Sequence, residues 1–78
     1  MSYTIYSRNG CPYCDNVKKV LTGIGETFVE YKLDTDFNRE QFVSQFGYGA
    51  TFPRVVKDGQ LLGGCNETVL YLRNQGLV

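Results

Sequence analysis

The chain has 78 residues, enough for one small hydrophobic core but not for a second domain, so we expect residues 1–78 to form a single domain. Its eight Lys and Arg residues balance eight Asp and Glu residues and are scattered, which argues against nucleic acid as a partner. We find neither a signal peptide nor an apolar run of about 18 residues, and therefore expect a cytoplasmic protein without membrane contact.

The first two predicted elements are a strand and a helix. Residues 3–7 (YTIYS) are β-prone, which predicts a strand. Apolar residues then recur every three or four positions from residue 14 to residue 24, which predicts a helix that ends near Gly23 or Gly25. A C-x-x-C motif therefore lies at a strand-to-helix junction.

Pro12 suits the first turn of this helix, where its missing N–H has no partner to lose. Cys11 is then at or beside the N-cap, and Cys14 lies one turn further along. We expect Cys11 to be exposed and Cys14 to be sheltered.

The cysteine count limits what the motif can do. A structural zinc site needs four ligands, but the chain has no histidine and only Cys65 besides the pair, and three cysteines cannot all pair with one another. A redox pair is favoured, because a helix amino terminus and the nearby Arg8 both stabilise a thiolate. Cys11 is then the nucleophile and Cys14 the resolving cysteine, although Cys14 also suits a simple buried apolar position.

Residues 27–34 are predicted to form a second strand. Val29, Tyr31 and Leu33 alternate with polar residues, so we expect these three side chains on the buried face. A strand–helix–strand unit of this length predicts a right-handed connection and parallel strands.

A second helix is predicted from Arg39 to Phe46, with a stop at Gly47. Asn38 and Gln41 have the spacing of a capping box. The staple and core positions of this helix are apolar: Phe37, Phe42, Val43 and Phe46.

The last part of the chain predicts a hairpin and a helix. Two apolar runs flank Asp58-Gly59, which is typical of an antiparallel hairpin with a two-residue turn. The final helix is expected to end at Gly76 and to place three apolar residues on one side, namely Val69, Leu70 and Leu72. The class is therefore α/β, with the order β-α-β-α-β-β-α and a four-stranded mixed sheet flanked by helices.

Three motifs in this order resemble a dithiol glutaredoxin of the thioredoxin fold: CPYC at residues 11–14, TFPRV at residues 51–55 and GGCNE at residues 63–67. The resemblance covers nearly the whole chain. It implies a glutathione-dependent thiol–disulfide oxidoreductase that reduces protein disulfides and glutathione mixed disulfides, with no bound cofactor and with glutathione as the reducing co-substrate. It also suggests ribonucleotide reductase and other cytoplasmic thiol enzymes as acceptors, and we expect a monomer.

The resemblance bears on Pro53 and Phe52. The residues alone favour an ordinary trans proline. The resemblance implies instead a cis proline packed beside the redox pair, which leaves the backbone of Phe52 to pair with a peptide-like substrate. Phenylalanine stands here where the family more often has valine.

The resemblance also implies a glutathione site at the start of the last helix. Gly64 belongs to a glycine run whose N–H groups suit an anion, although such a run also suits a simple helix entry. Cys65 and Asn66 would hold the γ-glutamyl carboxylate. Glu67, where aspartate is commoner, would hold the amino group.

Three further residues complete the implied site. Arg8, where the family usually has lysine, and Arg39 would meet the glycine carboxylate of glutathione, and the alignment of Arg39 needs one extra residue before Thr51. Both arginines also suit solvated surface positions. The side chain of Tyr13 would stack against glutathione.

Two rival functions stay open. One is a glutaredoxin-like donor reduced directly by thioredoxin reductase, which the tyrosine of CPYC and the acidic segment at the last helix disfavour. The other is a carrier of a [2Fe–2S] cluster held across a dimer by Cys11 and glutathione, which Pro12 disfavours.

Overall fold

The computed structural model describes residues 2–78, and its elements follow the predicted order. Its strands are β1 (Tyr3–Ser7), β2 (Phe28–Lys32), β3 (Arg54–Lys57) and β4 (Gln60–Gly63), and its helices are α1 (Pro12–Gly23), α2 (Arg39–Phe46) and α3 (Cys65–Asn74). None of these helices is long and apolar enough to cross a membrane.

The four strands form one mixed sheet in the order β2-β1-β3-β4. β1 runs parallel to β2 and antiparallel to β3, and β3 pairs with β4 in a hairpin. Asp58 and Gly59 form the turn with φ values of 52° and 84°, the left-handed backbone that a two-residue hairpin requires. The predicted parallel pair and hairpin are therefore both confirmed.

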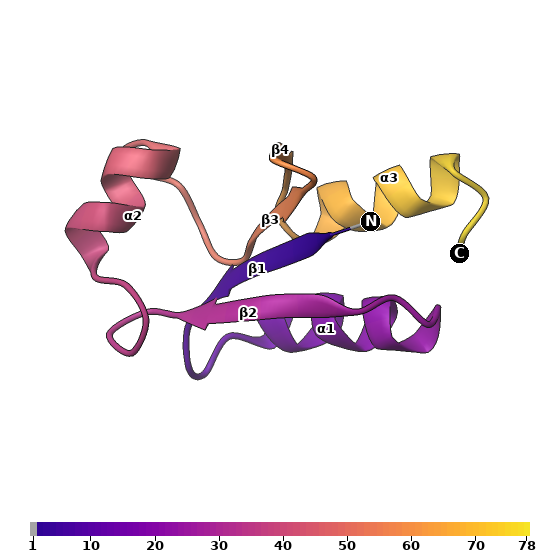
Figure 1. The fold of residues 1–78 in the computed structure, drawn as a ribbon, viewed down its shortest axis with the longest axis horizontal. Coiled ribbons are helices and arrows are strands. Elements are labelled where there is room, and N and C mark those ends of the chain that lie inside the picture. The colour runs from indigo at the N-terminus through magenta and orange to yellow at the C-terminus, as the bar shows by residue number, and fades with distance from the viewer. Residues whose placement is uncertain (1) are drawn as a thin grey trace.

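The hydrophobic core lies between one face of the sheet and the helices α1 and α3. Tyr3 and Ile5 of β1 point into it, and residues from both helices and from β3 complete it: Val17, Leu21, Val55, Cys65 and Leu72. In Figure 1 α1 runs alongside β1 and β2, while α3 and both chain termini lie toward the same end of the molecule. Burial of these apolar side chains is the main source of stability of the fold.

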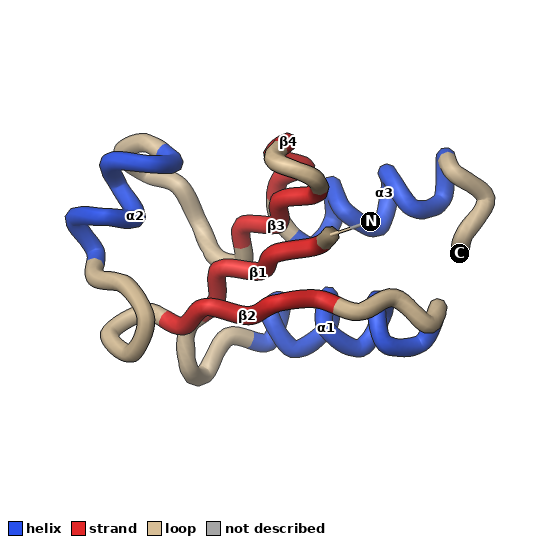
Figure 2. Tube along the Cα trace, in the orientation of Figure 1, coloured by secondary structure: helices blue, strands red, loops and turns tan. Residues whose placement is uncertain are grey.

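Helix α2 lies away from this core, beyond the carboxyl ends of β1 and β2 (Figures 1 and 2). Its predicted bounds are confirmed, and so is its capping box: the Gln41 N–H donates to Asn38 Oδ1 and the Asn38 N–H donates to Gln41 Oε1, both at 2.8 Å. Phe46 meets the ring of Tyr6 at a centroid distance of 5.0 Å. Side chains of aromatic residues thus join α2 to the end of the sheet.

The predicted burial is wrong at two positions of β2 and at one position of α3. Val29 and Tyr31 are 49% and 42% exposed. Phe28 and Glu30 pair with the buried Tyr3 and Ile5 of β1, so they take the core side and turn the alternate residues of β2 outward. Leu70 is also exposed, at 56%, whereas its neighbour Val69 packs against the core.

Candidate active site

Cys11 and Cys14 are joined in a disulfide at the amino terminus of α1. Cys11 is the N-cap with an extended backbone, and Pro12 follows at the first helical position. The N–H of Cys14 lies 3.2 Å from the Sγ of Cys11, so the helix directs an N–H dipole at that sulfur. The pair thus has the local geometry that a strand-to-helix C-x-x-C motif predicts.

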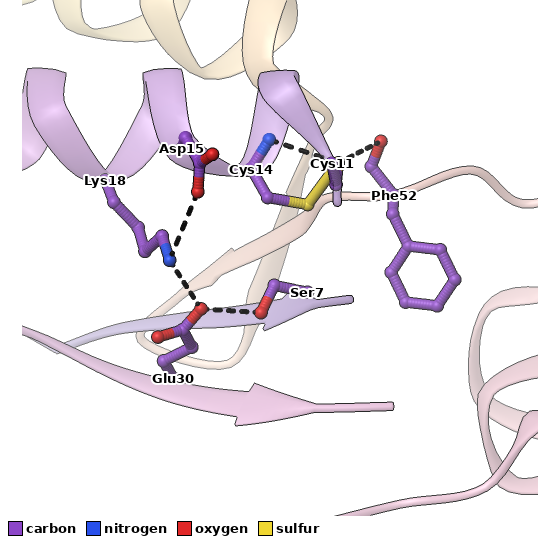
Figure 3. A network of polar contacts seen from close by, with 7 residues as sticks. All are labelled: Ser7, Cys11, Cys14, Asp15, Lys18, Glu30 and Phe52. Atoms are coloured by element: carbon purple, nitrogen blue, oxygen red, sulfur yellow. Dashed lines mark hydrogen bonds and ion pairs between the residues drawn. A yellow bond between two sulfur atoms is a disulfide. The ribbon is translucent and has the colours of Figure 1, made fainter. Parts of the chain in front are cut away.

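The prediction that Cys11 is exposed is wrong, because only 4% of its surface is accessible. Its Sγ is bonded to Cys14 and lies 3.9 Å from the carbonyl oxygen of Phe52 (Figure 3). Phe52 reaches this position from the loop before β3. The peptide between Phe52 and Pro53 is cis, as the resemblance implies and contrary to what the residues alone favour.

Arg54 secures the loop that carries the cis proline. Its Nε donates to the carbonyl oxygens of Thr51 at 2.9 Å and of Pro53 at 3.2 Å, and its Nη2 lies 3.4 Å from the Thr51 hydroxyl oxygen. Sequence reasoning missed this role. The sequence contained one signal for it, an arginine directly after a proline at the start of a strand. From that position the guanidinium N–H groups can reach nearby backbone carbonyl oxygens.

A groove of about 170 Å³ opens between the C-x-x-C turn, the cis-proline loop and the start of α3. Thr51, which the sequence did not single out, lines it together with most of the residues that the resemblance assigned to glutathione: Tyr13, Phe52, Pro53, Gly64, Cys65, Asn66 and Glu67. We call this the α3 groove. The fold therefore gathers three separate sequence motifs around one opening.

The amino terminus of α3 is partly occupied by the helix's own carboxylate. Glu67 Oε1 accepts the N–H of Gly64 at 2.7 Å. Burial raises the pKa of the Cys65 thiol, and the nearby Glu67 carboxylate raises this pKa further. Cys65 is consequently a poor thiolate former, although it stands at a helix amino terminus.

Arg8 and Arg39 lie outside the α3 groove. The guanidinium carbon of Arg8 is 5.9 Å from the centroid of the Phe52 ring. Arg39 lines a second groove, between α2 and the loop before the cis proline, which also has Phe52 in its wall. Phe52 lines both grooves, and neither arginine lines the one at α3.

A charged network that the sequence did not reveal holds α1 against the sheet. Glu30 Oε2 accepts the hydroxyl of Ser7 at 2.6 Å and lies 3.0 Å from Lys18 Nζ, which is also 3.6 Å from Asp15 Oδ1 (Figure 3). Burial acts to raise the pKa of Glu30, but the hydrogen bonds from Ser7 and Lys18 outweigh it and leave this pKa lowered. The hydrogen bond to Glu30 in turn raises the pKa of Lys18.

Within residues 2–78, no group of three or more His, Cys, Asp and Glu side chains lies close enough together to hold a metal ion. The site itself contains a disulfide beside a cis proline, on a four-stranded mixed sheet with three helices. This fold and this pair define a thioredoxin-fold protein with a C-x-x-C redox motif.

Comparison with known proteins shows which family of thioredoxin-fold proteins this chain resembles. The family model described as Glutaredoxin matches residues 3–62. Glutaredoxin-C6 of Oryza sativa subsp. japonica is 35% identical over 75 residues, which cover 92% of this chain and 66% of the rice protein. Glutaredoxin 3 of Escherichia coli K12 is 34% identical over 64 residues, covering 81% of this chain and 76% of that protein.

Solved structures agree with the family match. The crystal structure of a buckwheat glutaredoxin–glutathione complex superposes with a TM-score of 0.80 at 25% identity, covering 96% of this chain and 71% of that one. Glutaredoxin 1 from Francisella tularensis superposes with a TM-score of 0.79 at 27% identity, covering 97% and 95%. The chain belongs to the glutaredoxin family, whose members are thiol–disulfide oxidoreductases of the thioredoxin fold.

Proposed function

We propose that this protein reduces protein disulfides and glutathione mixed disulfides, and that glutathione regenerates it. The observation that carries the proposal is the α3 groove, because one opening next to the disulfide gathers a tyrosine, a cis proline and a helix amino terminus from three motifs. The similarity to a buckwheat glutaredoxin that was solved with glutathione supports this ligand.

Reduction of a protein disulfide proceeds in two exchange steps. The Cys11 thiolate attacks one substrate sulfur, the substrate S–S bond breaks, and the released thiolate takes up a proton. Cys14 then loses its proton and attacks Cys11 Sγ, which releases the second substrate thiolate and leaves the Cys11–Cys14 disulfide. Two electrons have passed to the substrate.

Two glutathione molecules return these electrons. The thiolate of the first attacks Cys11 Sγ, which forms a mixed disulfide and frees Cys14. The thiolate of the second attacks the glutathione sulfur of that mixed disulfide, which yields oxidised glutathione and reduced Cys11. A glutathione mixed disulfide as substrate enters at this intermediate, so Cys14 is not needed for it.

The α3 groove supplies the contacts for glutathione in this proposal. The N–H groups of Cys65 and Asn66, which have no partner inside the first turn of α3, donate to the γ-glutamyl carboxylate. Glu67 uses one carboxylate oxygen for the Gly64 N–H and offers the other to the amino group. Tyr13, which is 58% exposed, stacks along the peptide.

The remaining contacts lie at the edges of the site. The backbone of Phe52 pairs with the cysteine residue of glutathione beside Pro53. Arg8, whose guanidinium lies near the Phe52 ring, and Arg39, which lines the second groove with Phe52, attract the glycine carboxylate. Cytoplasmic disulfide enzymes such as ribonucleotide reductase are the proposed acceptors, and a monomer is the proposed working form.

The test is reduction of the mixed disulfide of glutathione and 2-mercaptoethanol, which forms when glutathione reacts with hydroxyethyl disulfide, with glutathione, glutathione reductase and NADPH supplied. We expect wild type and Cys14→Ser to be active and Cys11→Ser to be inactive. An inactive wild type would overturn the dependence on glutathione. Regeneration by thioredoxin reductase, or a brown anaerobic preparation that loses its cluster when glutathione is removed, would then identify the function instead.

A further inference from the structure

A second groove, of about 560 Å³, lies on the other side of Phe52 from the α3 groove. We call it the α2 groove. Its wall is largely apolar and comes from α2 and from the loop before the cis proline, with Phe42, Val43, Tyr48, Ala50 and Phe52 as its main members. This volume and this kind of lining are typical of sites that accept an apolar group.

The wall shared by the two grooves is held firmly. The ring of Phe52 stacks on Phe42 at a centroid distance of 4.2 Å with 17° between the ring planes, and on Phe37 at 6.2 Å with 23°. The guanidinium of Arg8 lies near the same ring. Because aromatic stacking fixes the ring, the α2 groove is already formed without a ligand.

Phe52 also connects the α2 groove to the reacting sulfur. Its carbonyl oxygen faces Cys11 Sγ, while its side chain points away from the disulfide (Figure 3). A substrate cysteine that bonds to Cys11 therefore brings its backbone beside that of Phe52. An extended peptide advances about 3.3 Å per residue, so side chains one or two residues from this cysteine come within reach of the α2 groove.

The surroundings indicate a polypeptide as the occupant. Tyr48 is 98% exposed at the groove, so its ring and hydroxyl are free to contact a bound chain. Arg39 and Glu40 are exposed at the same opening. Their opposite charges can interact with the backbone or with polar side chains of a bound polypeptide. Continuity with the reactive disulfide makes a substrate of the same reaction the natural occupant.

We propose that the α2 groove is a specificity subsite for protein disulfides, and that it binds a large apolar side chain one or two residues from the reactive substrate cysteine. The inference rests on the proposed function only in its disulfide exchange, and not in its use of glutathione. A bulky apolar residue beside the substrate cysteine should then accelerate attack by Cys11, because binding in the groove holds the disulfide near the nucleophile.

The test is a single turnover of pre-reduced protein with peptide disulfide dimers, in which no glutathione is needed. One peptide carries Phe on both sides of its cysteine and the other carries Ser. We expect wild type to reduce the Phe peptide about tenfold faster in second-order rate constant, a ratio in the range that one apolar pocket provides. Equal rates for the two peptides would overturn the inference.

Two variants test whether the preference for the Phe peptide arises in the α2 groove. Val43→Asn makes the wall polar, and Ala50→Leu fills the space without removing any packed side chain. Both should bring the ratio of the two peptides close to one. Val29→Asn makes the same chemical change on the exposed β2 position and should keep the wild-type ratio.

The outcomes separate the two proposals. If both groove variants keep the preference for Phe, the α2 groove is not the subsite. If neither peptide reacts while the glutathione mixed disulfide is reduced, the inference fails, and of the proposed function only the reduction of glutathione mixed disulfides stands. If the peptides react as expected but glutathione cannot regenerate the protein, the inference stands and the dependence on glutathione fails. Melting curves for each variant identify any loss of fold.

Discussion

Two cysteines stand at the amino termini of two helices that face the same region, yet their surroundings differ. Cys11 is the N-cap of α1, and the N–H of Cys14 points at its sulfur. Cys65 is the first residue of α3, where the N–H of Gly64 goes to the carboxylate of Glu67 instead. An N–H group at the start of α1 is thus directed at the sulfur of Cys11. The positive end of the α3 dipole is already partly neutralised by the carboxylate of Glu67.

This difference teaches that a helix amino terminus does not by itself make a cysteine reactive. The dipole of α3 is present at Cys65, but burial and the carboxylate of Glu67 both raise the pKa of that thiol. At Cys11 the dipole acts without a carboxylate among the hydrogen-bond partners that the structure gives to its sulfur. Under the proposed function, the identity of the group that accepts the first-turn N–H helps to decide which cysteine attacks.

The largest expected effect is on alkylation. In reduced Cys14→Ser, where no intramolecular disulfide can form within the pair, iodoacetamide at pH 7 should modify Cys11 on the order of 100-fold faster than Cys65. The two rates can be followed separately by mass spectrometry of peptides. Comparable rates would mean that the environments of the two helix ends do not differ as the structure indicates.

A glycine substitution should disrupt the α3 end selectively. Gly63 has a φ of 122°, and an added Cβ would lie 2.8 Å from Cβ of Glu67. Gly63→Ala should therefore lower the free energy of unfolding by about 2–3 kcal/mol, measured by urea denaturation. Gly23→Ala is the control, because nothing lies within 4 Å of its added Cβ, and it should be neutral or slightly stabilising. An unaffected Gly63→Ala would contradict the close approach of Glu67.

The features that the sequence predicted correctly depend on residues that are close together in the chain. The N-cap position of Cys11, the capping box of α2 and the turn at Asp58-Gly59 each depend on residues a few positions apart, and each is confirmed. Hydrogen bonding and backbone preferences over such short spans follow from residue type alone. The element order follows from the same kind of signal.

The errors arise from contacts between distant segments. Cys11 is buried beside Phe52, which is 41 residues away in the sequence. Glu30 is turned inward with the help of Ser7, 23 residues away, and Lys18, so the alternation of apolar residues in β2 predicted the wrong face. The α2 groove likewise depends on the packing of α2 against Phe52, which no local pattern specifies.

A smaller effect is expected when the carboxylate at the α3 end loses its charge. Under the proposed function, Glu67→Gln removes the ionic contact to the amino group of glutathione, so the KM for glutathione should rise roughly tenfold with little change in kcat. Steady-state kinetics with glutathione reductase and NADPH measure both constants. Asn16→Asp, an exposed change on α1, is the control and should leave the KM near its wild-type value. An unchanged KM in Glu67→Gln would remove Glu67 from the site.

The smallest effect concerns the network that holds the α1 end against the sheet. Removing either charge of the Glu30–Lys18 pair should cost about 1 kcal/mol of stability at pH 7, because the pair is partly buried and Glu30 also accepts from Ser7. A double-mutant cycle with Glu30→Gln and Lys18→Met should therefore show coupling, whereas a cycle with the neighbouring Lys19→Met should show none.

The pH dependence of that cycle gives the sharper result. Since the pKa of Glu30 is lowered by folding, its stabilising contribution is present above its ordinary value of 4.5 and is lost as the pH falls through the lower value of the folded state. The coupling with Lys18 should therefore be constant from pH 5 to pH 7 and disappear in more acidic solution. Coupling that persists after Glu30 is protonated would show that packing of the aliphatic part of Lys18, and not the ion pair, holds α1 against the sheet.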